Sequence, residues 1–532
     1  MNGDIVALPS LKSSAGACLW ACKGVSDELE ELELNNGSPF AYIASKSTID
    51  PGGCVCVRAI VPLRNNMNGT IEYRPIAGWP EDSIMVDLAM VSSEDPLYKD
   101  ARVTVPVDMQ RKQMADRYYE GVAQLYDPGI YQLDARLEYR NGQWNANPGQ
   151  PMVPYMEQPI EAGLRSKVHV RLDHRHTTHV ARHQELPLCV VGDAPGRWIP
   201  ETNLPHVWLP SQYMSAVEDS RVWLPYHCRL RRISHSEFAY RMSQKYPSVH
   251  WYGDSNSRRT LRPFIMGGKW CHEANTTTRL DCLCNDAPKD LYPTDWYARM
   301  PIPRWYRIHG TGVNGSEIFA DHRRKNDHAP NAPPVSFKAD ALRATYVGPD
   351  YVPHGYESRT DYFDLYYLFT RGTLDMYGSH WARDISANAV SAYPPASLVV
   401  VQLITWDVAF GDYTPFTRHV EQMARRLRAV YPHSEFIYRS GPYWCCRAAE
   451  TDDKKYSRLR FLAFDRYARQ VFRKQLGARV WDVMTVQASR APESKRLEEN
   501  MPCLSAHTRG EHIHLDNQLL MNMIVNSVAE GF

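Results

Sequence analysis

The first third of the chain alternates hydrophobic and polar residues with a period of two, and clusters of Gly, Pro, Asn and Asp interrupt the alternation. This pattern is typical of β-strands that bury one face, and the interruptions are typical of turns. Because short strands at this spacing favour an antiparallel sandwich, we expect an all-β domain between about residues 38 and 172. The predicted strands are residues 69–76, 83–91, 101–109, 129–139 and 167–172.

The second half of the chain has a different pattern, in which apolar strands alternate with stretches of helical periodicity. This order predicts βαβ units and a mostly parallel sheet. The predicted helices are residues 414–430, residues 457–476 with Gly477 as the C-terminal stop, and residues 515–528. The predicted strands are residues 248–255, 396–406, 434–440 and 478–484.

These patterns divide the chain into two predicted domains, residues 1–185 and residues 186–532. Residues 173–190 are polar and basic and lack apolar periodicity, so we expect a linker there. Residues 187–250 are rich in Trp and Pro and are expected to form an irregular lead-in to the second domain. The predicted fold class is therefore α/β, with a mostly parallel sheet that is preceded by an all-β sandwich.

Charge and hydropathy exclude two classes of protein. Lys and Arg together number 61 and Asp and Glu 60, so the chain lacks the basic surplus with which nucleic-acid-binding proteins attract phosphate. The longest apolar run, residues 396–405, is half of the roughly 20 residues that a membrane helix needs. We expect neither nucleic-acid binding nor a membrane span in this chain.

The cellular compartment stays open between two alternatives. Residues 1–16 lack the basic and apolar parts of a secretory signal, which favours the cytoplasm or a targeting segment that this sequence does not contain. The chain also has 12 cysteines, which suit disulfides in an oxidising compartment. Four Asn-x-Ser/Thr sequons, which suit a glycoprotein, lie at Asn36, Asn68, Asn275 and Asn314.

The strongest candidate for chemistry is the sequence Gly253-Asp254-Ser255, at the predicted junction of a strand and a helix. A serine at a helix N-terminus has its hydroxyl beside unpaired N–H groups and the positive end of the helix dipole. Such a serine can act as a nucleophile, and the N–H groups can stabilise an oxyanion. The alternative is that Asp254 and Ser255 only cap the helix.

A base for this serine is predicted just before the last helix, at residues 510–516 (GEHIHLD). A carboxylate three residues before an imidazole can share one side of a turn with it, so Glu511 can orient His514 while the other ring nitrogen faces the serine. His512 is the alternative base, and Asp516 is the alternative carboxylate. The structural alternative is that both carboxylates only complement the helix dipole.

Together the two motifs resemble those of the SGNH (GDSL-like) hydrolases, and more narrowly those of the PC-esterase branch, which includes the neurexophilin-and-PC-esterase-domain proteins. Residues 253–255 match the Gly-Asp-Ser block of that family, and Glu511-x-x-His514 matches its Asp-x-x-His block with Glu in place of Asp. The resemblance implies an α/β/α sandwich and chemistry on acyl esters of carbohydrates. Residues 129–145 resemble an immunoglobulin- or filamin-like module, which neurexophilin-type relatives place before the esterase domain.

Two further blocks of the SGNH family, which supply oxyanion donors from a Gly and an Asn, are matched less well. After the apolar strand, this chain has Thr405-Trp406-Asp407 where the family has the Asn. A Gly-rich loop at residues 309–315 is the candidate for the Gly block, with the alternative that it is only a turn. The candidate oxyanion donors are therefore Ser255, Gly312 and Trp406.

Two clusters of metal-ligating residue types have simpler interpretations. Five histidines between His169 and His183 are interleaved with arginines, which favours a solvated basic linker or a patch for acidic glycans over a metal site. Cys271, Cys282 and Cys284 lack the two-residue spacer of ordinary zinc knuckles, so a disulfide-stapled insertion is preferred. We expect no metal and no cofactor.

The expected function is that of a serine-dependent O-acyl transferase or esterase, with acetyl as the expected acyl group and a glycan as the substrate. In this hypothesis Ser255 attacks the ester carbonyl, His514 transfers the proton and Glu511 orients the imidazole. The partners would be an acylated glycan and, for a transferase, an acetyl donor. The resemblance implies the Golgi lumen or the extracellular space. The alternative is a catalytically inactive SGNH-like protein that acts in binding or adhesion.

Overall fold

The computed structural model divides the chain into two compact units, Met1–Gly142 with Met156–Thr178 and Gln143–Tyr155 with His179–Phe532. The residues that the structure describes are 18, 20–23, 39–61, 82–101, 103–111, 118–139, 158–162, 165–172, 183–206, 217–218, 221–265, 304–309, 318–319, 362–375, 380–391, 393–443, 456–489 and 510–529. None of the helices among these residues combines the length and the apolar character that a membrane crossing requires.

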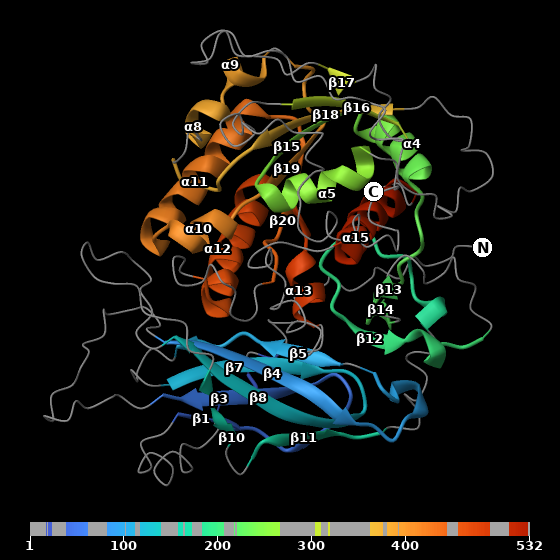
Figure 1. Cartoon of the computed structure of the whole chain (residues 1–532), viewed down its shortest axis with the longest axis vertical. Helices are drawn as coiled ribbons and strands as arrows, with labels where there is room; N and C mark the ends of the chain where they lie inside the picture. The colour runs from blue at the N-terminus through green and yellow to red at the C-terminus, as the bar shows by residue number, and fades with distance from the viewer. Residues whose placement is uncertain are drawn as a thin grey trace, which may run out of the picture. The chain divides into compact units, whose positions relative to one another are not determined.

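The first unit contains two β-sheets (Figure 1). Neighbouring strands run antiparallel except at two places, where β1 pairs with β10 and β2 pairs with β11 in parallel. One sheet has the order β10 (Glu161–Ala162), β1 (Phe40–Ile43), β3 (Gly53–Ile60), β7 (Tyr118–Leu125), β6 (Gln110–Arg111). The other has the order β2 (Thr48–Ile49), β11 (Lys167–Val170), β8 (Gly129–Tyr139), β4 (Ser83–Ser92), β5 (Thr104–Val107), and β9 (Gln158–Pro159) pairs with β8.

Burial along these strands explains in part which of them the sequence pattern predicts; β7 also alternates buried and half-buried residues but was not predicted. β8 alternates buried and more exposed residues over most of its length, and it coincides with the prediction for residues 129–139. β4, β5 and β11 lie within or overlap three more predicted strands. In β3, by contrast, residues 55–60 are all buried, so the strand lacks the polar alternation and the pattern misses it. The strand predicted at residues 69–76 lies outside the described residues.

Two disulfides fix the N-terminal segment to β3. Cys18 is bonded to Cys54, 36 residues away in sequence, and Cys22 is bonded to Cys56, 34 residues away. Cys54 and Cys56 are two residues apart in the strand, so their side chains leave the same face. Cross-links of this span stabilise a fold mainly because they restrict the unfolded chain.

The predicted irregular lead-in forms a small antiparallel sheet in the second unit, so that prediction is wrong. Trp198 and Trp223 are cross-strand partners with ring centroids 5.4 Å apart. Aromatic pairs of this kind stabilise a sheet even where its strands end in proline, as these two do at Pro200 and Pro225. The Cys189–Cys228 disulfide cross-links the same segment. The strand order is β12 (Gly196–Pro200), β14 (Arg221–Pro225), β13 (Val217–Glu218).

A seven-stranded sheet forms the centre of the second unit (Figure 1). Its order is β17 (Ile318–Phe319), β16 (Arg304–His309), β18 (Tyr362–Phe369), β15 (Ser248–Gly253), β19 (Leu398–Gln402), β20 (Glu435–Arg439), β21 (Arg479–Trp481). The last five strands of this order run parallel, and β16 and β17 extend the sheet antiparallel beside β18. In chain order the parallel strands are arranged 2-1-3-4-5, which is a doubly wound sheet.

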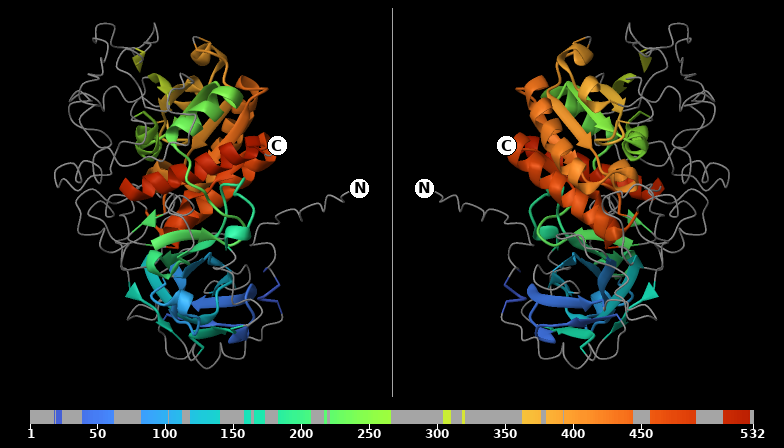
Figure 2. Two further views of the ribbon diagram at one scale, coloured as in Figure 1. Left: turned by 90° about the vertical axis from the view of Figure 1, so that its right-hand side faces the viewer. Right: turned by 90° about the vertical axis from the view of Figure 1, so that its left-hand side faces the viewer.

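Helices cover both faces of this sheet, as Figures 1 and 2 show. One face carries α4 (His235–Lys245), α5 (Ser255–Ile265) and α15 (Gly510–Ala529). The other carries α10 (Thr405–Phe410), α11 (Tyr413–Val430) and α12 (Arg458–Leu476). The short helices are α8 (Trp381–Asp384), α9 (Ala387–Val390) and α13 (Val483–Ala488). The second unit is therefore mixed α/β, with a mostly parallel sheet between two layers of helices.

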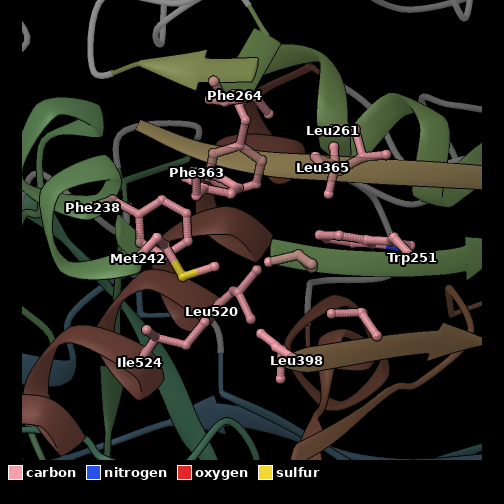
Figure 3. Close-up of a pocket in the computed structure, with 13 residues that line it drawn as sticks. Phe238, Met242, Trp251, Leu261, Phe264, Phe363, Leu365, Leu398, Leu520 and Ile524 are labelled. Carbon is pink, nitrogen blue, oxygen red and sulfur yellow. The ribbon is translucent and has the colours of Figure 1, made fainter. Parts of the chain in front are cut away.

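The core beneath α4, α5 and α15 is lined by apolar side chains (Figure 3). They include Phe238 and Met242 of α4, Leu261 and Phe264 of α5, Leu520 and Ile524 of α15, and Trp251, Leu365 and Leu398 of the sheet. Burial of this many large apolar groups is the main force that holds the three helices against the sheet.

The strands and helices that the pattern predicts in this unit are confirmed, with one correction. β15, β19, β20 and β21 lie within predicted strands, and α11 and α12 match predicted helices. Gly477 follows α12 with a φ of 64°, in the left-handed region that glycine favours. The last helix is predicted from residue 515 but begins at Gly510. The pattern misses its first turn because Glu511 and His512 interrupt the apolar stripe.

The linker predicted at residues 173–190 can be tested by limited proteolysis. We expect trypsin to cut the native chain first after Arg175 or Arg182, because residues 173–182 are polar and basic and lack apolar periodicity. His183, by contrast, is buried and follows these sites directly. Mass spectrometry of the first fragments identifies the cut. First cuts inside residues 71–139 would contradict a compact N-terminal sandwich.

A buried histidine joins the central sheet to the end of α11. His250 of β15 has Nε2 3.1 Å from the carbonyl oxygen of Pro394 and Nδ1 2.8 Å from the Tyr431 hydroxyl. A carbonyl only accepts, so Nε2 donates and Nδ1 accepts from the hydroxyl. Burial lowers the pKa of His250 to about 4, although the hydrogen bond to Pro394 raises it. The imidazole is therefore neutral at physiological pH.

This shift predicts that the fold loses stability in mild acid. A histidine of the unfolded chain, with a pKa near 6.5, takes up a proton that the folded chain excludes, so stability falls as the pH drops from 6.5 to about 4. The loss amounts to about 3 kcal/mol. Urea unfolding at a series of pH values measures it. His250→Gln should reduce this pH dependence without abolishing it, because burial also lowers the pKa of His183, to about 3. The same replacement of the exposed His433 should have little effect. An unchanged pH dependence in His250→Gln would refute the assignment.

Candidate active site

The turn between β15 and α5 places Ser255 at the carboxyl end of a parallel strand. β15 ends at Gly253 and α5 begins at Ser255, as the sequence predicts. The Asp254 carboxylate accepts a hydrogen bond from Asn256 N at 2.8 Å, and the Asp254 carbonyl accepts one from Arg258 N at 3.0 Å. Asp254 therefore caps the helix, and Ser255, 8% exposed, is its first residue.

The geometry of this turn requires glycine at position 253. A Cβ on Gly253 would lie 2.0 Å from Ser257 Oγ and 2.6 Å from Ser257 Cβ. The neighbouring strand fixes the carbonyl groups of the turn. The Tyr367 hydroxyl lies 3.1 Å from the Gly253 oxygen and 3.0 Å from the Asp254 oxygen, and Thr370 N donates to the Gly253 oxygen at 2.9 Å. The position of Ser255 is thus set by a close-packed backbone.

The strand order places this turn where doubly wound sheets bind ligands. β15 is the first parallel strand in the chain, and the next two, β18 and β19, lie on opposite sides of it. The connections at their carboxyl ends therefore diverge, which is the arrangement at which doubly wound sheets generally bind ligands. The turns that follow β15 and β19 lie at this switch point.

A buried polar network lies behind the Ser255 turn. Gln402 Nε2 donates to Asp254 Oδ1 at 2.9 Å, the Ser257 hydroxyl donates to Gln402 Oε1, and Trp251 Nε1 donates to Ser257 Oγ at 3.1 Å. Burial raises the pKa of Asp254, although its hydrogen bonds and the charge of Arg439 lower it. The network connects the carboxyl ends of β15 and β19.

The turn after β19 contains a residue in the left-handed region. Ile404 has a φ of 77°, which a β-branched residue rarely adopts. Asp407 accepts hydrogen bonds from Ile404 N at 3.1 Å, from Thr373 N at 2.9 Å and from Thr373 Oγ1 at 2.6 Å, so it fixes the turn. Burial raises the pKa of Asp407 to about 6, although these hydrogen bonds lower it. The candidate oxyanion donor Trp406 lies in the first turn of α10, which follows.

Positive charge gathers at the same edge of the sheet. The guanidinium groups of Arg258 and Arg371 each lie 5.4 Å from the Phe369 ring centroid, and that of Arg371 lies 5.0 Å from the Trp406 ring centroid. Phe369 ends β18 and is the register partner of Gly253. Both arginines are buried.

The first turns of α15 contain the predicted base and its carboxylate. Glu511, His512 and His514 lie within the helix, which begins at Gly510, and not in a loop before it. His514 is half-buried, and the side chains of Glu511 and His512 lie outside the described part of the structure. Residues three apart in a helix share a face, so the helix places Glu511 and His514 on one side.

Asp516 anchors the start of α15 to the edge of the sheet. Its Oδ2 accepts hydrogen bonds from Arg439 Nη2 and from Gln487 Nε2, each at 3.2 Å, and its carbonyl accepts one from Trp481 Nε1 at 2.8 Å. Arg439 and Trp481 are the last residues of β20 and β21. Arg439 and Asp516 are both buried completely. A role for Asp516 in orienting the imidazole remains a prediction.

α5 and α15 pack side by side and run in the same direction. Asn517 Nδ2 donates to the Thr260 carbonyl at 3.0 Å. α5 starts at the carboxyl end of β15. α15 runs from Asp516, at the ends of β20 and β21, toward the start of β21, where the Met523 carbonyl accepts from Arg479 at 3.4 Å. The N-terminal turns of the two helices therefore lie at the same edge of the sheet. Ser255 and His514, which are 259 positions apart in sequence, are both in these turns.

Several predicted residues lie outside the described part of the chain, among them Gly312 and the cysteines at 271, 282 and 284. Sequence analysis in turn missed Gln402, Arg439 and Asp407. Gln402 and Arg439 each end a strand that is otherwise largely apolar. A polar residue at the carboxyl end of a buried strand is the signal that points to such positions.

No metal site is assigned within the described ranges. One group of three metal-ligating residues converges there, Cys22, Cys56 and Glu120 of the first unit. Cys22 and Cys56 are joined in a disulfide, and Glu120 forms an ion pair with Arg58 at 3.0 Å. These ligand atoms are therefore already used in the fold.

Comparison with known proteins gives structural matches but none in sequence. No family model matches the chain, and no curated protein matches it. A solved structure of Est24, a carbohydrate acetylesterase from Sinorhizobium meliloti, is 10% identical with a TM-score of 0.26, and the match covers 54% of this chain and 99% of Est24.

Two further matches cover more of this chain. A carbohydrate esterase family 2 enzyme with a carbohydrate-binding domain, from Corynascus thermopiles (Myceliophthora fergusii), is 9% identical with a TM-score of 0.21, over 86% of this chain and 95% of that one. The salicylyl-acyltransferase SsfX3 of a tetracycline biosynthetic pathway is 11% identical with a TM-score of 0.23, over 84% of this chain and 74% of that one. The chain is thus similar to solved esterases and an acyltransferase, with low TM-scores and low sequence identities.

Proposed function

We propose that the second unit is a serine-dependent acyl esterase or acyltransferase of the SGNH type. The observation that carries this proposal is the position of Ser255, at the start of a helix and at the switch point of a doubly wound sheet, beside the parallel helix that contains His514. At this position the N–H groups at the start of α5 can donate to the oxyanion, and the adjacent helix α15 supplies the imidazole of His514.

The mechanism assigns one role to each residue. His514 takes the proton from the Ser255 hydroxyl as that oxygen attacks the ester carbonyl, and it returns the proton to the leaving alcohol. Glu511 accepts from the second ring nitrogen and stabilises the imidazolium. The Ser255 N–H stabilises the oxyanion, with Gly312 and Trp406 as the further candidate donors. Water then completes an esterase cycle, and a sugar hydroxyl completes a transferase cycle.

The finer parts of the proposal follow from the resemblance of the two motifs. It implies an acylated glycan, with acetyl as the acyl group, as the substrate, an acetyl donor for a transferase, and an immunoglobulin-like identity for the first unit. The three disulfides among the described residues favour an oxidising compartment, and so the secretory pathway or the extracellular space over the cytoplasm.

The second candidate function is binding or adhesion by an inactive protein. It is favoured by two departures from the family pattern, Trp406 in place of the Asn donor and Glu511 in place of Asp. An inactive protein would keep the fold and lose the nucleophilicity of Ser255, so a chemical test of this serine separates the two functions.

A fluorophosphonate probe on the purified chain provides that test. We expect labelling of the wild type and background labelling of Ser255→Ala. Ser243→Ala is the matched control, because Ser243 lies in α4 and donates its hydroxyl to the Tyr240 carbonyl at 2.7 Å. Thermal melts show whether each variant is folded. A folded wild type that is not labelled would favour the binding protein over the enzyme.

A further inference from the structure

The Gln402 amide uses both of its ends on residues that flank Ser255. Its Nε2 donates to Asp254 Oδ1 at 2.9 Å, and its Oε1 accepts from the Ser257 hydroxyl. Asp254 comes directly before Ser255 and Ser257 two residues after it. Gln402 itself is completely buried at the end of β19, the strand next to β15. One side chain of the adjacent strand therefore connects both sides of the candidate nucleophile.

The direction of each hydrogen bond in this network follows from chemistry. An indole N–H only donates, so Trp251 Nε1 donates to Ser257 Oγ at 3.1 Å. The Ser257 hydroxyl therefore donates its own proton to Gln402 Oε1. The Gln402 NH₂ group consequently points at Asp254, whose Oδ1 also accepts from Asn256 N. The amide orientation is thus determined by a donor at one end of the network and a carboxylate at the other.

We infer that Gln402 is a positioning residue for Ser255, which fixes the first turn of α5 relative to the carboxyl edge of the sheet. This inference rests on the proposed function, since it concerns the same serine. Gln402 does not reach the substrate, and it acts through Asp254 and Ser257. A nucleophile displaced by about 1 Å can lose roughly 100-fold in rate, so the loss of both hydrogen bonds should be visible in turnover.

Replacement by glutamate gives this role a distinctive pH signature. A protonated Glu at position 402 can donate to Asp254 and accept from Ser257, as the amide does. An ionised Glu cannot donate, and it places a second negative charge against a buried carboxylate. Gln402→Glu should therefore position Ser255 correctly only while the new side chain keeps its proton.

The experiment measures two quantities between pH 5 and pH 8, the rate constant of fluorophosphonate labelling and the turnover of 4-nitrophenyl acetate. Each rate of Gln402→Glu is divided by the wild-type rate at the same pH. This ratio removes the effect of the titration of the base, which both proteins share. We expect this ratio to be within a few-fold of 1 at the acid end and to fall by about 100-fold at the alkaline end. Gln402→Met should lower kcat at every pH, with little change in KM.

Asn522→Asp is the matched control. Asn522 is a buried amide of α15 that accepts from Arg231 N at 3.0 Å and donates to the Arg231 carbonyl at 2.8 Å, away from the carboxyl edge. It undergoes the same amide-to-acid change with a similar loss of hydrogen bonds. We expect its activity ratio to stay flat with pH, and thermal melts at each pH show whether either variant unfolds.

Two outcomes would overturn the inference, and they are distinguishable. If the wild type reacts with the probe and Gln402→Glu follows the same pH profile as Asn522→Asp, the positioning role is wrong and the proposed function stands. If the folded wild type neither reacts nor turns over ester at any pH, the proposed function fails and this inference fails with it.

Discussion

Replacement of His514 by glutamine is expected to lower the turnover of an acyl ester by about 10²–10⁴-fold, because it removes the general base of the mechanism. The thermal melt should change little, because the side chain is only half-buried. Fluorophosphonate labelling should fall with turnover, since both need an activated Ser255. The matched comparison is His512→Gln, the same change two residues earlier. If His512→Gln removes activity and His514→Gln does not, the base is His512.

The carboxylate that orients the base is identified by a second set of variants. Glu511→Gln should lower turnover by a few orders of magnitude with the fold retained, because an amide can favour the wrong imidazole tautomer. Glu511→Asp should retain more activity, because it restores the residue of the family pattern. If Glu511→Gln is without effect and Asp516→Asn abolishes turnover in a folded protein, Asp516 is the third member. If neither matters, the catalytic unit is a dyad.

The fold of the second unit could be predicted in part from sequence, because several of its strands and helices are long or strongly patterned, whereas β16 and β18 were not predicted. The apolar stripe of α11 and the uninterrupted apolar run of β19 each specify one element. The lead-in sheet was not predictable in this way. Its strands contain prolines, and they become stable through the Trp198–Trp223 pair and the Cys189–Cys228 disulfide, which join residues distant in sequence.

The residues of the candidate site also fall into two groups, those that local sequence predicts and those that it does not. Gly253, Asp254 and Ser255 were predictable because a strand, a tight turn and a helix cap adjoin in sequence. Gln402 and Arg439 were not, because their roles depend on strand order. Only the 2-1-3-4-5 arrangement places the end of β19 beside the Ser255 turn and the end of β20 beside α15. The strand order decides which residues lie next to a residue at the edge of the sheet, and the local periodicity of the sequence does not encode the strand order.

The buried Arg439–Asp516 ion pair should give the largest single effect on stability. Burial lowers the pKa of Arg439, although Asp516 and Asp254 raise it. Arg439→Met should cost about 3–5 kcal/mol in the free energy of unfolding, because it leaves the Asp516 charge buried without its cationic partner. Urea unfolding at pH 7 measures the change. Arg425→Met is the control, since Arg425 forms an exposed pair with Glu421 at 3.8 Å and should cost less than about 1 kcal/mol.

The double variant Arg439→Met/Asp516→Leu separates two contributions to the free energy of unfolding, the penalty of an unpaired buried charge and the stabilisation by the ion pair itself. If the single loss comes from a stranded carboxylate, removal of that carboxylate should recover most of the stability, because apolar replacements of a buried pair are often nearly neutral. The recovered protein should still turn over ester poorly, because the start of α15 has lost its anchor to β20 and His514 is two residues away from it. If the double variant is as unstable as Arg439→Met, the ion pair itself stabilises the fold. If the double variant is both stable and fully active, the anchor has no part in placing the base.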